Sequence, residues 1–326
     1  MCGDIMLEKL SIVVPCFNEE KMVPCFYQET LIYIKELAIN YEIIFVNDGS
    51  SDNTWNEIIK LNTLDNNIRA INFSRNFGKE AAMLAGIRSA KGDYVVVMDC
   101  DLQHPPYLLP KMYYLLKKEA YDAVGAYRLG RTNNKRNESF LRILYAKIFY
   151  KFINKMSNIN IKTNATDYRM MKRRVVNALL EINEYNRFSK GLFEWVGFRT
   201  TYVGYEDVKR TQGKSSWSFI KLLNYALEGI TSFSTVPLKL SGLLGLLCAS
   251  MSFLYMAYVI IDRIFRGTEV SGWATTVSLI LFLGGIMLIS LGLLGEYIGR
   301  IYNEVKKRPL YIIDEIINNE EDQDDK

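Results

Sequence analysis

Two carboxylates follow a strongly apolar run in this chain. Asp99 and Asp101 come directly after residues 94–98, and the amide side chain of Gln103 follows them. A run of apolar and β-branched residues is typical of a strand covered on both faces, and open α/β sheets bind ligands beyond the carboxyl ends of such strands. Hard oxygen donors suit Mg²⁺ or Mn²⁺ better than zinc. We therefore predict a Mg²⁺ or Mn²⁺ site that carries a diphosphate; the alternative is a pair of solvated loop acids.

The elements that must position these acids alternate between strands and helices. Strands are predicted at residues 10–15, 41–46, 68–73 and 94–98, and helices at 22–39, from 54, and at 79–89. Strands that alternate with helices form βαβ units around a mostly parallel sheet. Neither a Gly-x-Gly-x-x-Gly sequence after the first strand nor a P-loop is present, which argues against the usual dinucleotide-binding and P-loop domains. The first part of the chain is predicted to be an α/β domain of the nucleotide-binding type.

Polar residues at the other strand ends are suited to a nucleotide. The predicted nucleotide contacts are Pro15, Asn18, Glu19, Asp48, Lys79 and Asp99. The acceptor groups suit the ring N–H of uracil or guanine and the ribose hydroxyls. Lys79 follows Gly78 at the start of a predicted helix, where an anion is favoured. For Asn18, a turn-forming role is an equally good interpretation.

Two long apolar runs near the C-terminus predict a membrane hairpin. Residues 240–261 and 270–295 contain no charged residue, and each run reaches the roughly 20 residues that span a bilayer. The alternative is a pair of buried core helices. More basic residues flank the two runs on their outer sides than lie between them, so the positive-inside rule places the catalytic domain and both termini in the cytoplasm. The expected location is thus the cell membrane, with a multi-pass chain.

Composition excludes several other classes of protein. The net charge of +4 gives no nucleic-acid footprint, and the five cysteines form no CxxC pair that would indicate zinc or a disulfide framework. His104 is the only histidine, which excludes mechanisms that need two.

The predicted domains are 1–215 (catalytic), 216–236 (an interfacial amphipathic helix), 237–300 (membrane helices at about 240–261 and 272–295) and 301–326 (a tail). Arg210 and Lys214, just before the interfacial helix, are suited to a diphosphate or a lipid phosphate. The alternative is simple attraction to anionic lipid head groups.

Taken together, the motifs resemble a known family. They are Val13-Val14-Pro15 with Asn18-Glu19, Asn47-Asp48-Gly49-Ser50-Ser51-Asp52, Asn76-Phe77-Gly78-Lys79-Glu80, Asp99-Cys100-Asp101-Leu102-Gln103-His104 and Asp167-Tyr168-Arg169. This ordered set resembles the family 2 glycosyltransferases of GT-A fold. With the two C-terminal spans, it looks like the polyprenyl-phosphate glycosyltransferases, which include dolichol-phosphate mannose synthases and bactoprenol glucosyltransferases.

The resemblance implies a role for individual residues. It places the metal on Asp99, Asp101 and Gln103, and the nucleotide on Pro15, Glu19 and Asp48. Asp167 matches the acid proposed as catalytic base, so Asp101 and Asp167 are the expected catalytic residues. The alternative role for Asp167 is to orient the sugar or an arginine that binds the acceptor. Arg128 and Arg142 fall where the mannose synthases bind the acceptor phosphate; a solvated basic face is the competing interpretation for Arg142. Related bacterial enzymes suggest a homotetramer.

The predicted reaction is an inverting transfer of a sugar from a nucleotide sugar to polyprenyl (undecaprenyl) phosphate. We expect a UDP-sugar donor, with glucose or N-acetylglucosamine, although no residue decides the sugar or separates UDP from GDP. A processive polysaccharide synthase is one alternative, but its Gln-x-x-Arg-Trp element is missing around residues 183–188. A non-catalytic nucleotide-sugar sensor is the other, and the intact acidic motif argues against it.

Overall fold

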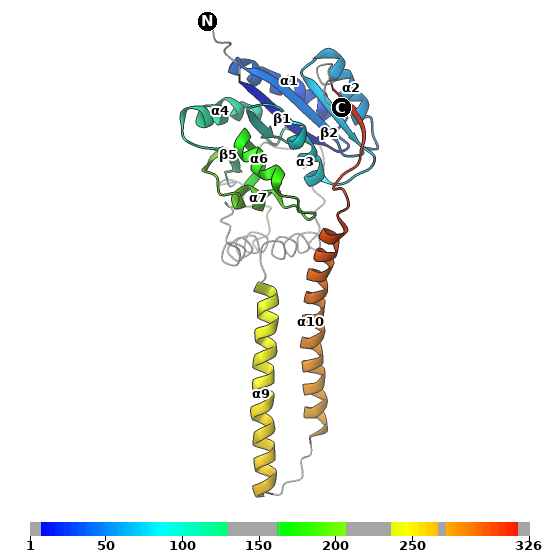
Figure 1. The fold of residues 1–326 in the computed structure, drawn as a ribbon, viewed down its shortest axis with the longest axis vertical. Helices are drawn as coiled ribbons and strands as arrows, with labels where there is room; N and C mark the ends of the chain where they lie inside the picture. Colours follow the sequence, from blue (N-terminus) through cyan, green and yellow to red (C-terminus); the bar gives the residue numbers. More distant parts are fainter. Residues whose placement is uncertain (1–7, 130–161, 163, 207–235, 267–271, 319–326) are drawn as a thin grey trace, which may run out of the picture. The chain divides into compact units, whose positions relative to one another are not determined.

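The computed structural model describes residues 8–129, 162, 164–206, 236–266 and 272–318. These residues fall into two compact units (Figure 1). One is an α/β unit, which takes in the described residues up to 206 together with residues 308–318. The other is a helical unit formed by the described residues between 236 and 307. The predicted interfacial helix at 216–236 and the acidic end of the chain lie outside the described residues, apart from Val236.

The described part of the α/β unit contains one eight-stranded sheet with strand order β7-β5-β6-β4-β1-β2-β3-β8. The strands are β1 (Lys9–Cys16), β2 (Asn40–Asn47), β3 (Ile68–Phe73), β4 (Tyr94–Val97), β5 (Ala123–Arg128), β6 (Ala165–Lys172), β7 (Thr200–Tyr205) and β8 (Ile313–Ile317). Strands β4, β1, β2 and β3 are parallel, whereas β6 is antiparallel to β4 and β5, and β8 is antiparallel to β3. The carboxyl ends of β1, β2 and β4 therefore meet at one edge of the sheet.

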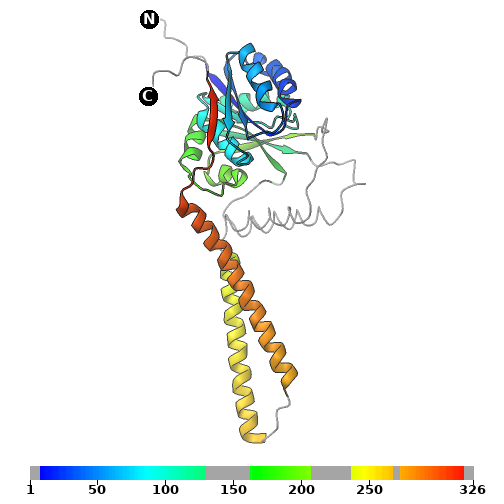
Figure 2. The same ribbon diagram turned by 90° about the vertical axis from the view of Figure 1, so that its right-hand side faces the viewer.

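Helices cover both faces of this sheet (Figure 2). They are α1 (Met22–Leu37), α2 (Thr54–Leu64), α3 (Lys79–Ser89), α4 (Leu109–Lys118), α6 (Arg173–Glu181) and α7 (Ser189–Trp195), with a 3₁₀ turn η1 at Pro106–Leu108. Ile12 and Val14 of β1 join the core under α1, α2 and α4, whereas Val13 faces α3 at Gly86, where no side chain would fit. Because both faces of β1 and β4 are buried, their sequences are continuous apolar runs rather than alternating ones.

The predicted fold class is confirmed by this arrangement. The strands expected at 10–15, 41–46, 68–73 and 94–98 correspond to β1 to β4, and the three predicted helices correspond to α1 to α3. Strand β8 was not predicted. It pairs with β3 after the long apolar runs, in a stretch that the sequence had suggested to be a tail.

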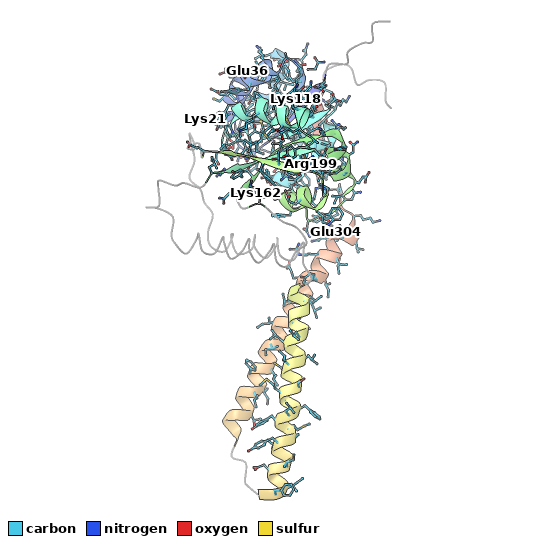
Figure 3. All side chains as sticks on the ribbon, turned by 90° about the vertical axis from the view of Figure 1, so that its left-hand side faces the viewer. Lys21, Glu36, Lys118, Lys162, Arg199 and Glu304 are labelled. Atoms are coloured by element: carbon cyan, nitrogen blue, oxygen red, sulfur yellow. The ribbon has the colours of Figure 1, made fainter. Side chains whose placement is uncertain are left out.

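The helical unit consists of two long helices that contact each other, α9 (Val236–Arg266) and α10 (Trp273–Lys306). Each contains a stretch long and apolar enough to cross a membrane, at Ser241–Val259 and Phe282–Lys306. Many of their large apolar side chains are exposed, as the sticks along both helices show (Figure 3). Helix α10 runs beyond the predicted end of the second span at 295 and carries charged residues such as Glu304 in its last turns.

Candidate functional site

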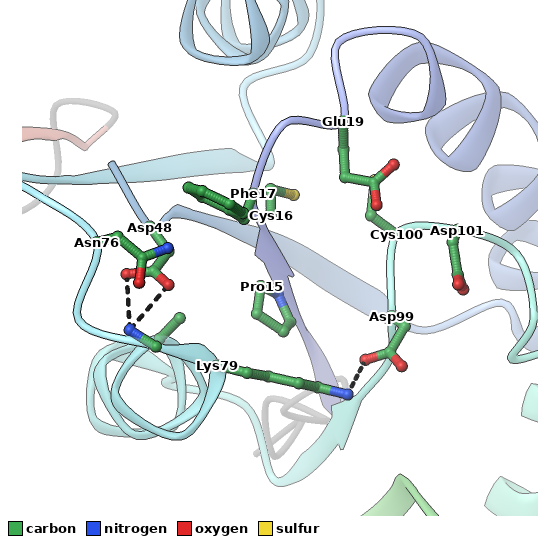
Figure 4. Close-up of a pocket in the computed structure, with 12 residues that line it drawn as sticks. Pro15, Cys16, Phe17, Glu19, Asp48, Asn76, Lys79, Asp99, Cys100 and Asp101 are labelled. Atoms are coloured by element: carbon green, nitrogen blue, oxygen red, sulfur yellow. Dashed lines mark hydrogen bonds and ion pairs between the residues drawn. The ribbon is translucent and has the colours of Figure 1, made fainter. Parts of the chain in front are cut away.

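A cavity of about 280 Å³ lies at the carboxyl ends of the parallel strands (Figure 4). It is lined by Pro15, Cys16, Phe17, Glu19, Asp48, Asn76, Gly78, Lys79, Ala82, Asp99, Cys100 and Asp101. Six residues predicted from the sequence thus line one cavity: Pro15, Glu19, Asp48, Lys79, Asp99 and Asp101. They come from three separate strand ends, those of β1, β2 and β4, and from the start of α3, which the parallel topology brings together.

The loop after β4 is held by its own backbone and by the single histidine. The backbone N–H of Asp99 donates to His104 Nδ1 at 3.0 Å, and the N–H of Gln103 donates to Asp101 Oδ1 at 3.0 Å. Burial lowers the pKa of His104, and its ring stacks on Tyr168 with centroids 5.2 Å apart. His104 therefore acts as a neutral acceptor that fixes the direction of the loop.

Lys79 joins two acids of the site. Its Nζ lies 2.6 Å from Asp99 Oδ1 and 2.9 Å from Asp167 Oδ2. Lys79 is the first residue of α3, and the preceding Gly78 has φ +96°, a conformation that favours glycine. Burial alone would lower the pKa of Lys79, but the two carboxylates outweigh it and hold that pKa above its ordinary value. The lysine is therefore a permanent cation between Asp99 and Asp167.

Asp167 reaches this cluster through the register of β6. Val97 of β4 pairs with Arg169 of antiparallel β6, so continuing the register two residues brings Asp167 level with Asp99. Burial opposes ionisation of Asp167, but Lys79 and then Lys190 lower its pKa to about 2. The Asp167 carboxyl is therefore ionised throughout the neutral range.

Asp48 anchors the loop that precedes α3. Its carboxylate accepts hydrogen bonds from the backbone N–H groups of Phe77 at 2.7 Å and of Gly78 at 2.9 Å. Burial nevertheless raises the pKa of Asp48 above its ordinary value, because it outweighs those two donors. Asp48 thus has a structural role in the wall of the cavity in addition to any contact with a ligand.

Asn18 does not line the cavity; it supports the neighbouring loop. Its N–H donates to Ser50 Oγ at 2.9 Å, and its side-chain oxygen accepts from the N–H of Ser51 at 2.9 Å. Its φ of +55° is a left-handed conformation that asparagine tolerates better than most residues. These contacts correspond to the turn-forming interpretation, while a role for Asn18 in nucleotide binding stays a prediction.

Gln103 and Arg128 contact each other. Arg128, at the end of β5, donates from Nη2 to Gln103 Oε1 at 2.8 Å. The oxygen that was predicted to bind a metal therefore faces a guanidinium in this structure. The contact joins the loop after β4 to a residue predicted to bind the acceptor phosphate. The other residues predicted for that role, Arg142, Arg210 and Lys214, lie outside the described residues.

Sequence reasoning gave no role to Glu80 and Arg169, two charged residues close in sequence to Lys79 and Asp167. Glu80, beside Lys79, accepts hydrogen bonds from the N–H and hydroxyl of Ser189 at the start of α7, and burial raises the pKa of Glu80. Arg169 is buried and donates to Glu194 at 2.8 Å and to the Tyr202 hydroxyl at 2.9 Å. Both residues belong to motifs found in the sequence, which was the available signal, but their partners lie far away in the sequence.

The donor set fits a hard divalent cation only in part. The Asp99 and Asp101 carboxylates lie in one cavity and are the type of ligand that Mg²⁺ and Mn²⁺ prefer. Across the described ranges, no group of three or more His, Cys, Asp or Glu residues is placed to hold a metal ion. This donor set fits an ion that takes its remaining ligands from a diphosphate and water, as Mg²⁺ commonly does.

Comparisons with known proteins agree with this arrangement. The model for Glycosyl transferase family 2 matches residues 11–180, and that for the GtrB C-terminal hairpin matches residues 236–301. A putative glycosyltransferase, CsbB of Bacillus subtilis (strain 168), is 44% identical over 306 residues, which cover 94% of this chain and 91% of that protein. The bactoprenol glucosyl transferase of Shigella phage SfII is 44% identical over 305 residues, 94% of this chain and 97% of that protein.

One solved structure is similar at lower identity. It is the glucosyl-3-phosphoglycerate synthase of Mycobacterium tuberculosis in complex with uridine diphosphate. It is 18% identical with a TM-score of 0.43, and the match covers 68% of this chain and 76% of that one.

Proposed function

Because this chain belongs to glycosyl transferase family 2 and carries a GtrB-type C-terminal hairpin, we propose that it transfers a hexose from a nucleotide sugar to polyprenyl phosphate. The observation that carries this proposal is the cavity at the ends of β1, β2 and β4, where Asp48, Lys79, Asp99 and Asp101 come together. The bactoprenol glucosyl transferases, similar over nearly their whole length, support the lipid acceptor.

The proposed donor is a UDP-sugar, with glucose or N-acetylglucosamine as the sugar. The uracil and ribose would lie along the Pro15, Glu19 and Asp48 side of the cavity, and the diphosphate would lie near Asp99 and Asp101. A Mg²⁺ or Mn²⁺ ion held by Asp101 and Asp99, with Gln103 as a third candidate ligand, would neutralise charge on the leaving diphosphate. Lys79 supplies a fixed positive charge at the same place.

The acceptor phosphate is the proposed nucleophile. A phosphate monoester has a second pKa near 6, so at neutral pH its oxygen attacks the anomeric carbon without first losing a proton. One displacement then forms the new C–O bond, breaks the bond to the diphosphate and inverts the anomeric centre. Since the pKa of Asp167 is about 2, its carboxylate is a poor proton acceptor at neutral pH. We assign it to orienting Lys79 and the sugar.

Arg128 is proposed to bind the acceptor phosphate, and Gln103 holds it in place. Arg128→Ala should raise the KM for polyprenyl phosphate about 10- to 100-fold and leave the KM for the nucleotide sugar unchanged, because a charge-assisted hydrogen bond is lost. Steady-state kinetics with each substrate varied in turn measures both constants. Arg199→Ala is the matched control, because Arg199 lies over the Tyr121 ring beside the start of β5, whereas Arg128 lies at the end of that strand. A donor KM that rises instead would contradict the assignment.

The proposed location is the cell membrane, with the catalytic unit and both termini in the cytoplasm. The two apolar helices and the hairpin match support membrane association, and the basic residues that flank the helices support the orientation. A homotetramer stays a prediction. Cysteine labelling of intact cells from outside tests the orientation: a Thr268→Cys variant should be labelled in the connection between α9 and α10, whereas Cys25, which is exposed on the α/β unit, should not be labelled.

The decisive test is transfer of radiolabelled sugar from a panel of UDP- and GDP-sugars to undecaprenyl phosphate. The full-length protein is assayed in detergent or nanodiscs with Mg²⁺ or Mn²⁺, and again after chelation by EDTA. We expect one labelled lipid, formed with a UDP-hexose and lost with EDTA. A long polymer would indicate a processive synthase instead. Nucleotide binding without any lipid product, under all these conditions, would favour a sensor.

A further inference from the structure

We propose that residues 311–317, which follow the second apolar helix, position the nucleotide-binding part of the site, with Tyr311 as the main positioning residue. This inference rests on the proposed function for the identity of the ligand. The segment follows the two apolar helices in the sequence, whereas every motif discussed so far precedes them. In Figure 2 this segment, coloured red, lies along the edge of the sheet.

The first residues of the segment, Tyr311 and Ile312, contact the end of β3. The backbone N–H of Ser74 donates to the carbonyl of Ile312 at 3.1 Å, just beyond the β3–β8 ladder. The Tyr311 ring stacks on Phe73 with centroids 5.0 Å apart and an interplanar angle of 11°. Arg88 of α3 donates to the Tyr311 hydroxyl at 3.1 Å. Tyr311 therefore joins the end of β3 to the helix that carries Lys79.

Further contacts connect Phe73 to the wall of the cavity. Phe73 packs edge-on against Phe77, with ring centroids 5.8 Å apart. The Arg75 guanidinium lies over the Phe77 ring, 4.0 Å from its centroid. The backbone N–H of Phe77 is one of the two donors to Asp48. A chain of direct contacts thus leads from Tyr311 through Phe73 and Phe77 to Asp48.

The loop at residues 74–78 has little other freedom. At Gly49 φ is +63°, and a Cβ there would lie 2.5 Å from Asn76 N and 2.8 Å from Arg75 Cα. The loop is therefore packed against Gly49 on one side and tied to residues 311–312 at its start. Asn76 and Gly78 line the cavity, and Lys79 follows directly. A shift at the start of this loop would displace groups on the donor side of the site, while Arg128 on β5 has no part in these contacts.

The alternative is that β8 only covers the open edge of β3. Outside the Tyr311 contacts, the segment is attached by the β3–β8 ladder and by packing of Ile317 against the core. Exposed polar bonds add to this attachment, from Trp55 Nε1 to Glu315 at 3.2 Å and from Asn72 to Asp314 at 3.3 Å. An edge cover would stabilise the sheet without acting on one substrate. The two interpretations differ in which kinetic constant changes when Tyr311 is altered.

The experiment uses three variants of the full-length protein. Tyr311→Ala removes the stacking, Tyr311→Phe keeps it, and Ile316→Ala alters an exposed residue of β8 away from the loop. Hydrogen–deuterium exchange of the peptide that covers residues 74–79 reports loop order without any ligand. Steady-state kinetics gives kcat and the two KM values, and calorimetry with UDP and GDP as probes gives the nucleotide Kd.

We expect Tyr311→Ala to raise the donor KM and the nucleotide Kd about 3- to 10-fold, the size expected for an aromatic pair. The acceptor KM should not change, and exchange at residues 74–79 should become faster. Tyr311→Phe keeps the stacking, so all of these values should stay as in the unsubstituted protein. Ile316→Ala should likewise alter none of them. The proposal is overturned if Tyr311→Ala lowers thermal stability while exchange at 74–79 and nucleotide binding stay as in the unsubstituted protein.

Failure of the proposed function gives a different result. If no sugar is transferred to the lipid but exchange at 74–79 and nucleotide Kd respond to Tyr311→Ala, the positioning role stands and the acceptor is wrong. If transfer occurs and all variants share one donor KM and one exchange rate, the function stands and the positioning role is wrong.

Discussion

Asp101→Asn is expected to lower kcat for sugar transfer about 100- to 1000-fold, the loss typical when a group that stabilises transition-state charge is removed. The substitution keeps the size of the side chain and an oxygen that can accept from the Gln103 N–H. Only the negative charge disappears, and with it the strongest ligand for a divalent ion at the leaving diphosphate. Transfer from the donor identified in the assay panel measures the effect.

Thermal unfolding distinguishes this loss from misfolding. We expect the Asp101→Asn midpoint to stay within about 2 °C of the unsubstituted protein, because no buried contact is removed. Glu57→Gln is the matched control: it also removes one carboxylate, at a surface ion pair with Lys60, and should leave kcat unchanged. Near-normal kcat in Asp101→Asn would remove Asp101 from the catalytic residues.

Lys79→Met should be the second most damaging change. It leaves Asp99 and Asp167 facing each other without the cation that now lies 2.6 and 2.9 Å from them. Two close carboxylates repel, so one of them takes up a proton more readily and the charge pattern of the site changes. We expect kcat to fall about 100-fold or more, as fixed positive charge near the diphosphate is lost.

The pH dependence of stability gives an independent readout with a definite sign. In the unsubstituted protein the pKa of Asp167 is about 2, below its ordinary value of 3.8, so its ion pair stabilises the fold above that ordinary value and is lost only as pH falls through about 2. In Lys79→Met a carboxyl pKa is raised in the folded state, so stability is lost at high pH and regained as pH falls.

The thermal midpoint of Lys79→Met should therefore lie further below that of the unsubstituted protein at pH 7.5 than at pH 5. Unfolding scans without nucleotide at both values measure this difference. Lys60→Met, which breaks only the exposed pair with Glu57, should show no such trend. An equal deficit at both pH values would mean that Lys79 does not hold the two carboxylates in their ionised form.

Much of the α/β unit could be predicted from the local sequence. The apolar runs of β2 and β4 are typical of strands covered on both faces, and Asp48 and Asp99 follow these two runs. In a parallel sheet the ends of neighbouring strands meet, so the cavity followed from the order of elements. The family resemblance added the reaction class, which the match to residues 11–180 now supports.

Contacts that depend on the register of antiparallel strands could not be predicted from the sequence. Asp167 lies level with Asp99 only because Val97 pairs with Arg169, and a shift of one residue would turn Asp167 to the other face of the sheet. The Gln103–Arg128 contact likewise requires β5 and the loop after β4 to meet in space. Strand β8 was missed because its neighbours in sequence are a membrane-type helix and an acidic end, and neither predicts a partner 240 residues upstream.

The pairing of β8 with β3 also sets the order in which this protein can be completed during biosynthesis. β3 leaves the ribosome early, but its partner is translated only after both apolar helices. At elongation rates of about 5–20 residues per second, the edge of β3 stays unpaired for a time on the order of tens of seconds. An unpaired strand edge is a template for association with other chains. Premature termination anywhere before residue 313 would leave that edge open for good, so truncated chains should be the species that aggregate or are degraded in the cell.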